Sequence, residues 1–95
     1  MDDPKDLTTR PLPPLPVAMT EVQSSDLHSI GYDPNGSYLL VRFRDKNGAP
    51  GKLYEYQGVP EWVYQDLLDG TGGSRGRFFS RIVKGGGFSY RKVEE

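Results

Sequence analysis

A serine in a glycine-rich segment has the surroundings of a catalytic nucleophile. Residues 72–76 are Gly-Gly-Ser-Arg-Gly, which matches the G-x-S-x-G pattern found around the nucleophile of many hydrolases. That pattern works where a buried strand leads into a helix of a large α/β sheet, whereas here it follows a predicted helix in a short chain. His28 is the single histidine and therefore the single candidate for a triad base. We interpret Ser74 as a helix cap and predict that the protein is not an enzyme.

Metal chemistry has equally little support in the sequence. The chain has no cysteine, and no carboxylates cluster around His28 at the spacing of metal ligands. The absence of cysteine also excludes disulfides. We therefore expect no metal site and no cofactor.

Basic charge in the last third of the chain is the strongest binding signal. Residues 1–69 carry six Lys/Arg and eleven Asp/Glu, whereas residues 70–93 carry six Lys/Arg and no acid. At about 100° per residue, Arg77, Arg81 and Lys84 share one side of a predicted helix, opposite its apolar side. Phosphate groups would relieve the repulsion between such like charges. The predicted nucleic-acid surface consists of Arg75, Arg77, Arg81, Lys84, Arg91 and Lys92. The alternative is that these side chains only solvate the outside of a helix.

Tyrosines could add base stacking to this basic surface. Tyr54, Tyr56 and Tyr90, with Tyr38, would be able to stack on bases if they project from an open face of a sheet. The alternative is that Tyr54 and Tyr56, which alternate along one strand, belong to the core.

A protein-interaction adaptor is the second functional hypothesis, and it rests on a tryptophan and a proline-rich segment. The polar helical neighbours of Trp62 are Gln65, Asp66 and Asp69, an acidic surround that suits a protein contact better than phosphate. Because a lone tryptophan is rarely left in water, the competing expectation is that it packs under the glycine-rich loop or the last strand. Residues 10–16 fit the pattern Arg-x-x-Pro-x-x-Pro, in which Arg10, Pro13 and Pro16 could contact a protein domain, although a spacer is the other interpretation.

The distribution of proline predicts the domain organisation. Five of the eight prolines lie in the first twenty residues, a segment without hydrophobic periodicity. We predict a flexible N-terminal arm over residues 1–21 and one domain over residues 22–95, since 95 residues rarely divide into two cores. No apolar run approaches the length of a membrane span, and the acidic start is unlike a signal peptide, which favours a cytoplasmic protein.

Turn residues and periodicity predict the elements of this domain. Strands are expected at residues 27–32, 38–44, 52–57 and 88–93, with alternation clearest where Leu39, Val41 and Phe43 share one face. Pro60 is expected to open a helix that ends at Gly70, and Ser74 a second helix. This order, β-β-β-α-α-β, predicts an α+β fold in which a small antiparallel sheet carries two helices on one face.

Many weakly diagnostic positions of this pattern resemble the KTSR domain family over about residues 22–93. They include Ser24-Ser25, Gly31-Tyr32, Val59-Pro60, Ser74, Gly76 and Phe78-Phe79. The resemblance implies a short bacterial or phage domain that also occurs at the C-terminus of some lysyl-tRNA synthetases. That occurrence makes RNA the preferred partner among nucleic acids, by analogy alone.

Overall fold

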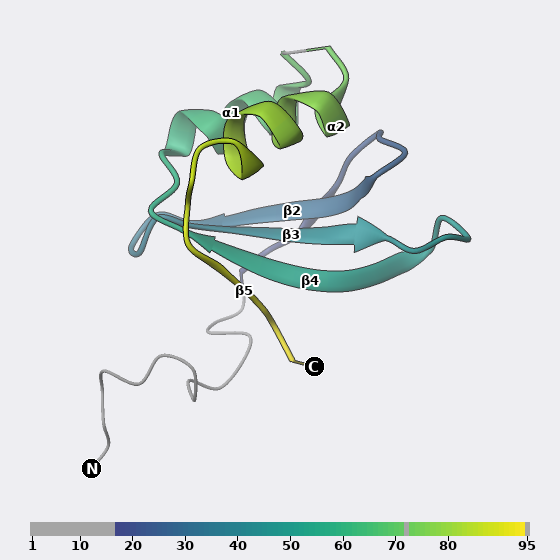
Figure 1. The fold of residues 1–95 in the computed structure, drawn as a ribbon, viewed down its shortest axis with the longest axis horizontal. Coiled ribbons are helices and arrows are strands. Elements are labelled where there is room, and N and C mark those ends of the chain that lie inside the picture. The colour runs from purple at the N-terminus through teal and green to yellow at the C-terminus, as the bar shows by residue number, and fades with distance from the viewer. Residues whose placement is uncertain (1–16, 72, 95) are drawn as a thin grey trace.

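The computed structural model describes residues 17–71 and 73–94 and contains one antiparallel sheet with helices on one side (Figure 1). The sheet order is β1-β2-β3-β4-β5, and every neighbouring pair is antiparallel. The elements follow the chain as β1 (Thr20–Glu21), β2 (Leu27–Asp33), β3 (Tyr38–Arg44), β4 (Pro50–Gln57), α1 (Glu61–Asp69), α2 (Arg75–Phe78), the π-helix η2 (Phe79–Lys84) and β5 (Tyr90–Lys92). The predicted α+β fold is confirmed, with the short strand β1 as an addition.

Local turn chemistry joins the three long strands. Between β2 and β3, the carboxylate of Asp33 accepts a hydrogen bond from the backbone of Asn35 at 3.0 Å. Between β3 and β4, the carboxylate of Asp45 accepts from the backbone of Asn47 and Ala49 at 2.8 and 3.0 Å. Gly48 in that turn has a φ of 83°, a conformation that favours glycine. These side chains determine where each strand reverses.

The strand register places the main core between the sheet and the helices. Leu39 pairs with Tyr56 and Val41 pairs with Tyr54, so these four side chains point to the helical side of the sheet. Tyr56 is only 4% exposed and belongs to the core. Tyr54 and Tyr56 therefore point to the helical side of the sheet with Val41, where Tyr56 is buried in the core and Tyr54 is half-buried at its edge. The buried members of this core are Val22, Leu27, Ile30, Leu39, Val41, Tyr56, Val59, Val63, Leu67, Phe78, Phe79 and Val83.

The other face of the sheet has a small core of its own. Leu40, Leu53 and Val93 are buried there, and Val17 and Met19 pack against them. A side chain at Gly31 would place its Cβ 2.7 Å from the main-chain oxygen of Ala18, so glycine is needed for this close approach. Residues 17–21 consequently belong to the folded unit, whereas the sequence suggested that the domain begins at residue 22.

Both helix beginnings use the residues that the sequence indicated. Pro60 is extended and directly precedes α1, one position before its predicted place. The hydroxyl oxygen of Ser74 accepts a hydrogen bond from the backbone of Arg77 at 3.3 Å, as a helix cap does. Gly70 ends α1 with a φ of 76°.

The second helix changes its winding halfway. After α2 the chain continues as η2, and the backbone N–H of Gly85 donates to the oxygen of Ser80, five residues earlier, at 3.0 Å. Such an i→i+5 ladder turns each residue through a smaller angle than an α-helix does. Side chains at α-helical spacing along residues 75–84 therefore drift apart around the axis.

Candidate nucleic-acid interface

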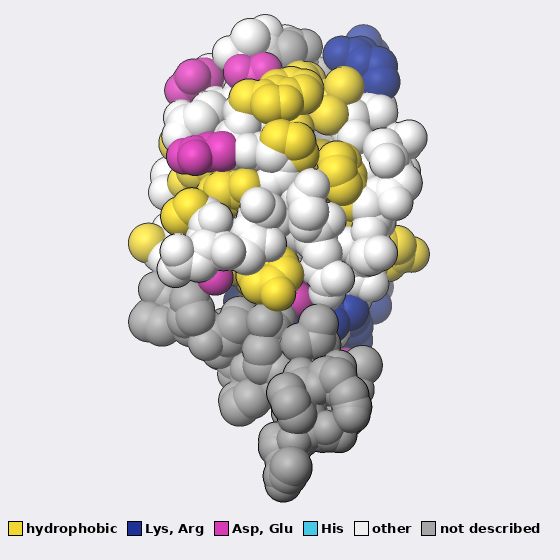
Figure 2. Space-filling model, turned by 90° about the vertical axis from the view of Figure 1, so that its left-hand side faces the viewer, with side chains coloured by type: hydrophobic (Ala, Val, Ile, Leu, Met, Phe, Trp, Pro, Cys, Tyr) yellow, Lys and Arg dark blue, Asp and Glu magenta, His cyan; other side chains and the backbone are white. Residues whose placement is uncertain are grey.

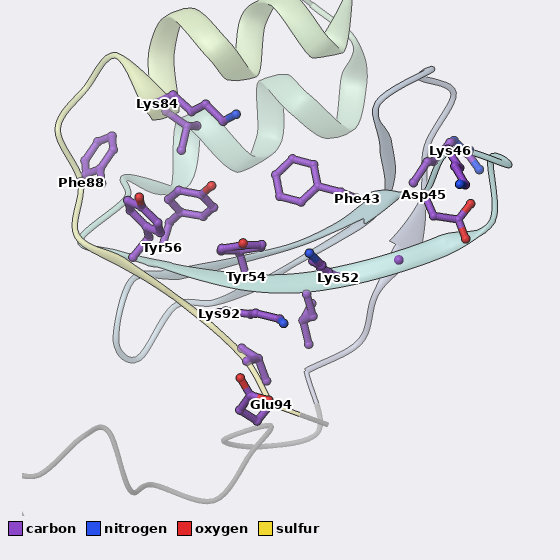
Figure 3. Close-up of a pocket in the computed structure, with 16 residues that line it drawn as sticks. Phe43, Asp45, Lys46, Lys52, Tyr54, Tyr56, Lys84, Phe88, Lys92 and Glu94 are labelled. Atoms are coloured by element: carbon purple, nitrogen blue, oxygen red, sulfur yellow. The ribbon is translucent and has the colours of Figure 1, made fainter.

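An aromatic hollow, here called the tyrosine groove, lies on the helical side of β4 and β5 (Figure 3). Tyr56 pairs with Tyr90 across the two strands, and their rings stack with centroids 5.4 Å apart. Tyr54 lies beside both, with ring centroids 6.5 Å from Tyr56 and 6.1 Å from Tyr90. The groove has a volume of about 1130 Å³. Its aromatic lining consists of Phe43, Tyr54, Tyr56, Phe88 and Tyr90.

The groove exists because the helices cover only part of the sheet. Figure 1 shows α1 and α2 above β2 and β3, while the chain after η2 descends as a loop to β5. Phe79 of η2 meets Phe43 and Tyr56 edge to face, with centroids 5.4 Å away in each case. Phe79 thus packs behind the aromatic lining of the groove, and Tyr90 at the outer strand stays 62% exposed.

Lysines surround the aromatic lining. Lys92 is the strand partner of Tyr54 and points to the same face, and Lys52 does so two residues before Tyr54. The ammonium nitrogen of Lys84 lies 5.9 Å from the ring centroid of Phe43 and 6.0 Å from that of Phe79. Lys46 completes the set, and the acids that line the groove are Asp45 and Glu94. The groove therefore combines exposed ammonium groups with aromatic faces.

Two of these lysines, Lys46 and Lys52, were not predicted as binding residues from the sequence. Lys46 and Lys52 lie in the acidic first part of the chain, outside the basic block that drew attention. The period-2 alternation of Lys52, Tyr54 and Tyr56 could have placed Lys52 on the tyrosine face. No comparable signal marks Lys46, which reaches the groove through the β3–β4 turn.

The tyrosine cluster keeps its innermost phenol protonated. Burial raises the pKa of Tyr56 to about 12, and the neighbouring phenols Tyr54 and Tyr90 add to the effect. Tyr56 therefore keeps its proton to a higher pH than a phenol in water does.

Two predicted binding residues, Arg75 and Arg91, have hydrogen-bond partners within the protein. Arg75 donates from its guanidinium to the carbonyl oxygens of Leu67, Leu68 and Gln23, at 2.6, 2.9 and 3.0 Å. Arg91 points to the opposite side of the sheet from the groove, where its Nε donates to the fully buried carboxylate of Glu55 at 3.0 Å.

The predicted basic stripe is divided because of the π-helix. Arg77 and Arg81 are exposed and line a separate cleft of about 690 Å³ with Ser25, Ser74 and Ser80. Lys84 leans over the aromatic rings of the groove instead (Figure 3). Two of the predicted basic residues, Lys84 and Lys92, thus line the same groove as the three predicted tyrosines. Arg77 and Arg81 lie outside that groove, in the separate cleft.

Trp62 does not pack under the glycine-rich loop or the last strand, and it is 56% exposed. The helical stripe of Val63 and Leu67 faces the core, so Trp62 points outward from the first turn of α1. Figure 2 views the end of the molecule where α1 begins and shows hydrophobic side chains there with acidic groups beside them. Arg10, Pro13 and Pro16 lie outside the described residues.

The geometry gives no support to a serine hydrolase. The hydroxyl of Ser74 caps α2, and the Nδ1 of His28 lies 3.1 Å from the hydroxyl of its neighbour Ser29. Within residues 17–71 and 73–94, no three metal-ligating side chains gather in one place. In the same part of the chain, no helix is long and apolar enough to cross a membrane.

The fold defines a small α+β domain with two helix segments on one face of an antiparallel sheet. The model of the KTSC domain family matches residues 23–88, and the chain belongs to that family. The family name expected from the sequence, KTSR, is corrected to KTSC.

Two similar proteins come from bacteria. An uncharacterized protein of Stutzerimonas stutzeri (strain A1501) is 38% identical over 73 residues, which cover 77% of this chain and 93% of that protein. The crystal structure of a KTSC domain protein from Yersinia pestis superimposes with a TM-score of 0.68 at 38% identity, covering 82% of this chain and 99% of the other.

Proposed function

We propose that this domain binds single-stranded nucleic acid, with RNA as the preferred form, through the tyrosine groove. The observation that carries the proposal is Tyr90, an aromatic ring that is 62% exposed, stacked on Tyr56 and adjacent to lysines of the groove. An exposed ring held in place by a second ring offers a rigid platform for a base. Base stacking on such a ring contributes about 1–3 kcal/mol per base in other single-strand binders.

Charge supports the same ligand class. Four lysines line the groove against two acids, Asp45 and Glu94. Lysine neutralises phosphate and releases its counterions, which makes binding dependent on salt. Neutral rings between these lysines match a ligand that alternates flat bases with phosphates.

The preference for RNA comes from the occurrence of similar domains on some lysyl-tRNA synthetases. The experiment therefore compares labelled single-stranded RNA and DNA of equal sequence.

Fluorescence anisotropy with the full chain at two salt concentrations tests the proposal. We expect Tyr90→Ala to weaken binding about 5- to 150-fold, the equivalent of one lost stacking contact. Tyr90→Phe keeps the ring and should bind like the unaltered protein. Trp62→Ala removes another exposed aromatic residue outside the groove and should leave affinity unchanged. Absence of binding at low salt, or equal affinity of Tyr90→Ala, would refute the proposal.

A protein-interaction adaptor is the second candidate, and the exposure of Trp62 favours it. A tryptophan that is 56% exposed beside acidic groups is typical of an interface anchor. Affinity purification with the unaltered chain and with Trp62→Ala would test this candidate. A bacterial protein retained by both variants equally would argue against a contact at Trp62.

A further inference from the structure

We infer that a strand bound in the tyrosine groove continues along α2 and η2 to Arg77 and Arg81, so that the ligand is an extended single strand and not a mononucleotide or a duplex. This inference rests on the proposed function and adds the path, the minimum length and the form of the ligand. It starts from the arrangement of three hollows along one seam of the molecule.

The three hollows are neighbours along the molecule, because each adjoining pair shares lining residues. The tyrosine groove and a smaller hollow of about 280 Å³ are both lined by Phe43, Arg44 and Lys84. That smaller hollow and the cleft at Arg77 and Arg81 are both lined by Asp26, Gly76 and Ser80. Together they form one trough between the second helix and the sheet, here called the seam trough.

Lys84 lies at the junction where the groove meets the rest of the seam trough. Its ammonium group is held over the rings of Phe43 and Phe79, while its side chain also lines the smaller hollow (Figure 3). The π-helical winding of η2 produces this position, since an α-helix would carry Lys84 round to the side of Arg81. A phosphate at Lys84 would therefore join bases stacked in the groove to a backbone running along the helix.

The far part of the seam trough is polar and mainly cationic. Arg77 and Arg81 are both exposed, and serine hydroxyls from residues 25, 74 and 80 lie with them. Asp26 is the acid that lines both smaller hollows, and it sits against the backbone of Gly76, where a Cβ would come 2.7 Å from its carboxylate oxygen. The guanidinium of Arg44 donates to the carbonyl oxygens of Val22, Ser24 and Gly48. The outward guanidinium groups of Arg77 and Arg81 are thus the ones left for phosphates.

The minimum length of the ligand follows from the distance between Arg77 and Lys84 along the second helix. Lys84 lies seven residues after Arg77, and the separation along the axis is at most about 10 Å, since the π-helical residues 79–84 rise less than the roughly 1.5 Å per residue of an α-helix. One nucleotide stacked on Tyr90 does not span this distance. A strand that fills the seam trough needs about four or more nucleotides, within the range of site sizes of other small single-strand binders.

The exposure of the stacked tyrosines favours a single-stranded ligand over a duplex. Tyr56 is only 4% exposed, so a base would stack on the exposed ring of Tyr90, which Tyr56 supports from behind. In a duplex each base face is already stacked on its neighbours, so a duplex offers no face to Tyr90.

A length series of labelled oligouridylates of 3, 5, 8 and 12 nucleotides, with a duplex of 12 base pairs, tests the inference on the full chain. For the unaltered protein we expect affinity to rise at least tenfold between 3 and 8 nucleotides and the duplex to bind at least tenfold more weakly than the 12-mer. Arg77→Ala/Arg81→Ala should abolish this rise while binding the trimer unchanged. Arg77→Lys/Arg81→Lys preserves the charge and should keep most of the rise.

The outcomes separate the inference from the proposed function. Loss of affinity at every length in Tyr90→Ala, together with a length-dependent rise that needs the arginines, would support both. If the trimer binds but affinity does not rise with length, or if the rise persists in Arg77→Ala/Arg81→Ala, the ligand does not follow the seam trough. Binding at the tyrosine groove would still stand. Equal binding of the duplex would overturn the single-strand requirement. No binding at any length would overturn the proposed function itself.

Discussion

The Nε of Arg75 donates a hydrogen bond to the main-chain oxygen of Leu67 at 2.6 Å, across the turn that separates α2 from α1. The same guanidinium reaches the oxygens of Leu68 and Gln23. The last carbonyls of a helix lack intrahelical donors, and a cation there also suits the negative end of the helix dipole. Arg75 therefore ties the end of α1 to the start of α2 and to the segment before β2.

Arg75→Ala should lower the free energy of unfolding by about 1.5–3 kcal/mol, the value of hydrogen bonds that involve a charged group. Lysine lacks the fork of donors, so Arg75→Lys should recover little of this loss. Urea denaturation measures the free energy of unfolding of both variants. Arg77→Ala, an exposed neighbour on the same helix, is the control and should change stability by less than about 0.5 kcal/mol. Equal stability of Arg75→Ala and Arg77→Ala would contradict a capping role.

The Glu55–Arg91 pair should matter for folding. The Glu55 carboxylate is fully buried and the Arg91 side chain is 18% exposed, with one guanidinium nitrogen, Nη2, buried without a hydrogen-bond partner. Removing one partner of a buried pair leaves an uncompensated charge, so Glu55→Ala should cost about 3–5 kcal/mol. The double variant Glu55→Leu/Arg91→Met should be more stable than Glu55→Ala. Strictly additive effects in this double-mutant cycle would refute an energetic coupling between the two residues.

Stability should fall at alkaline pH partly because of Tyr56. The pKa of Tyr56 is raised to about 12 by burial, whereas a phenol in the unfolded chain titrates near 10. The unfolded state therefore loses this proton first, and stability present below pH ~10 is lost as pH rises from ~10 towards ~12. Tyr56→Phe should flatten this decline relative to the unaltered protein, measured by urea denaturation at pH 9, 10 and 11. Tyr90→Phe, which removes an exposed phenol, is the control, and an identical decline in Tyr56→Phe would contradict the prediction.

Truncation should reveal where the domain begins. Val17 and Met19 pack against Leu40, Leu53 and Val93, and β1 pairs with β2. A chain that starts at residue 22 exposes this cluster and should lose about 2–4 kcal/mol, since each buried aliphatic side chain contributes about 1.5–3 kcal/mol when fully buried. A chain that starts at residue 17, after an initiating methionine, keeps both contacts. Comparable thermal unfolding midpoints of the two truncations would show that residues 17–21 contribute nothing to stability.

Turn and cap residues explain why much of the fold could be predicted. Asp33, Asp45, Ser74 and Gly70 act through partners a few residues away, so their roles are visible in a short stretch of sequence. The side of each strand that faces the helices also follows from local alternation. Strand β1 was missed because Thr20 and Glu21 have no apolar alternation and gain their place only by pairing with Ser29 and Ile30.

The sequence predicted most of the residues of the candidate site but not how they lie relative to one another. The basic block and the tyrosines are properties of the sequence, and so are the strand and helix positions that they occupy. Tertiary structure decided which basic side chains have partners within the protein, because the partners of Arg75 and Arg91 lie 8 and 36 residues away in Leu67 and Glu55. It also placed Lys84 over the rings of Phe43 and Phe79 and stacked Tyr90 on Tyr56, since long-range pairing and the winding of η2 set those positions. Local chemistry thus determined the elements of this protein, and packing between distant segments determined its groove.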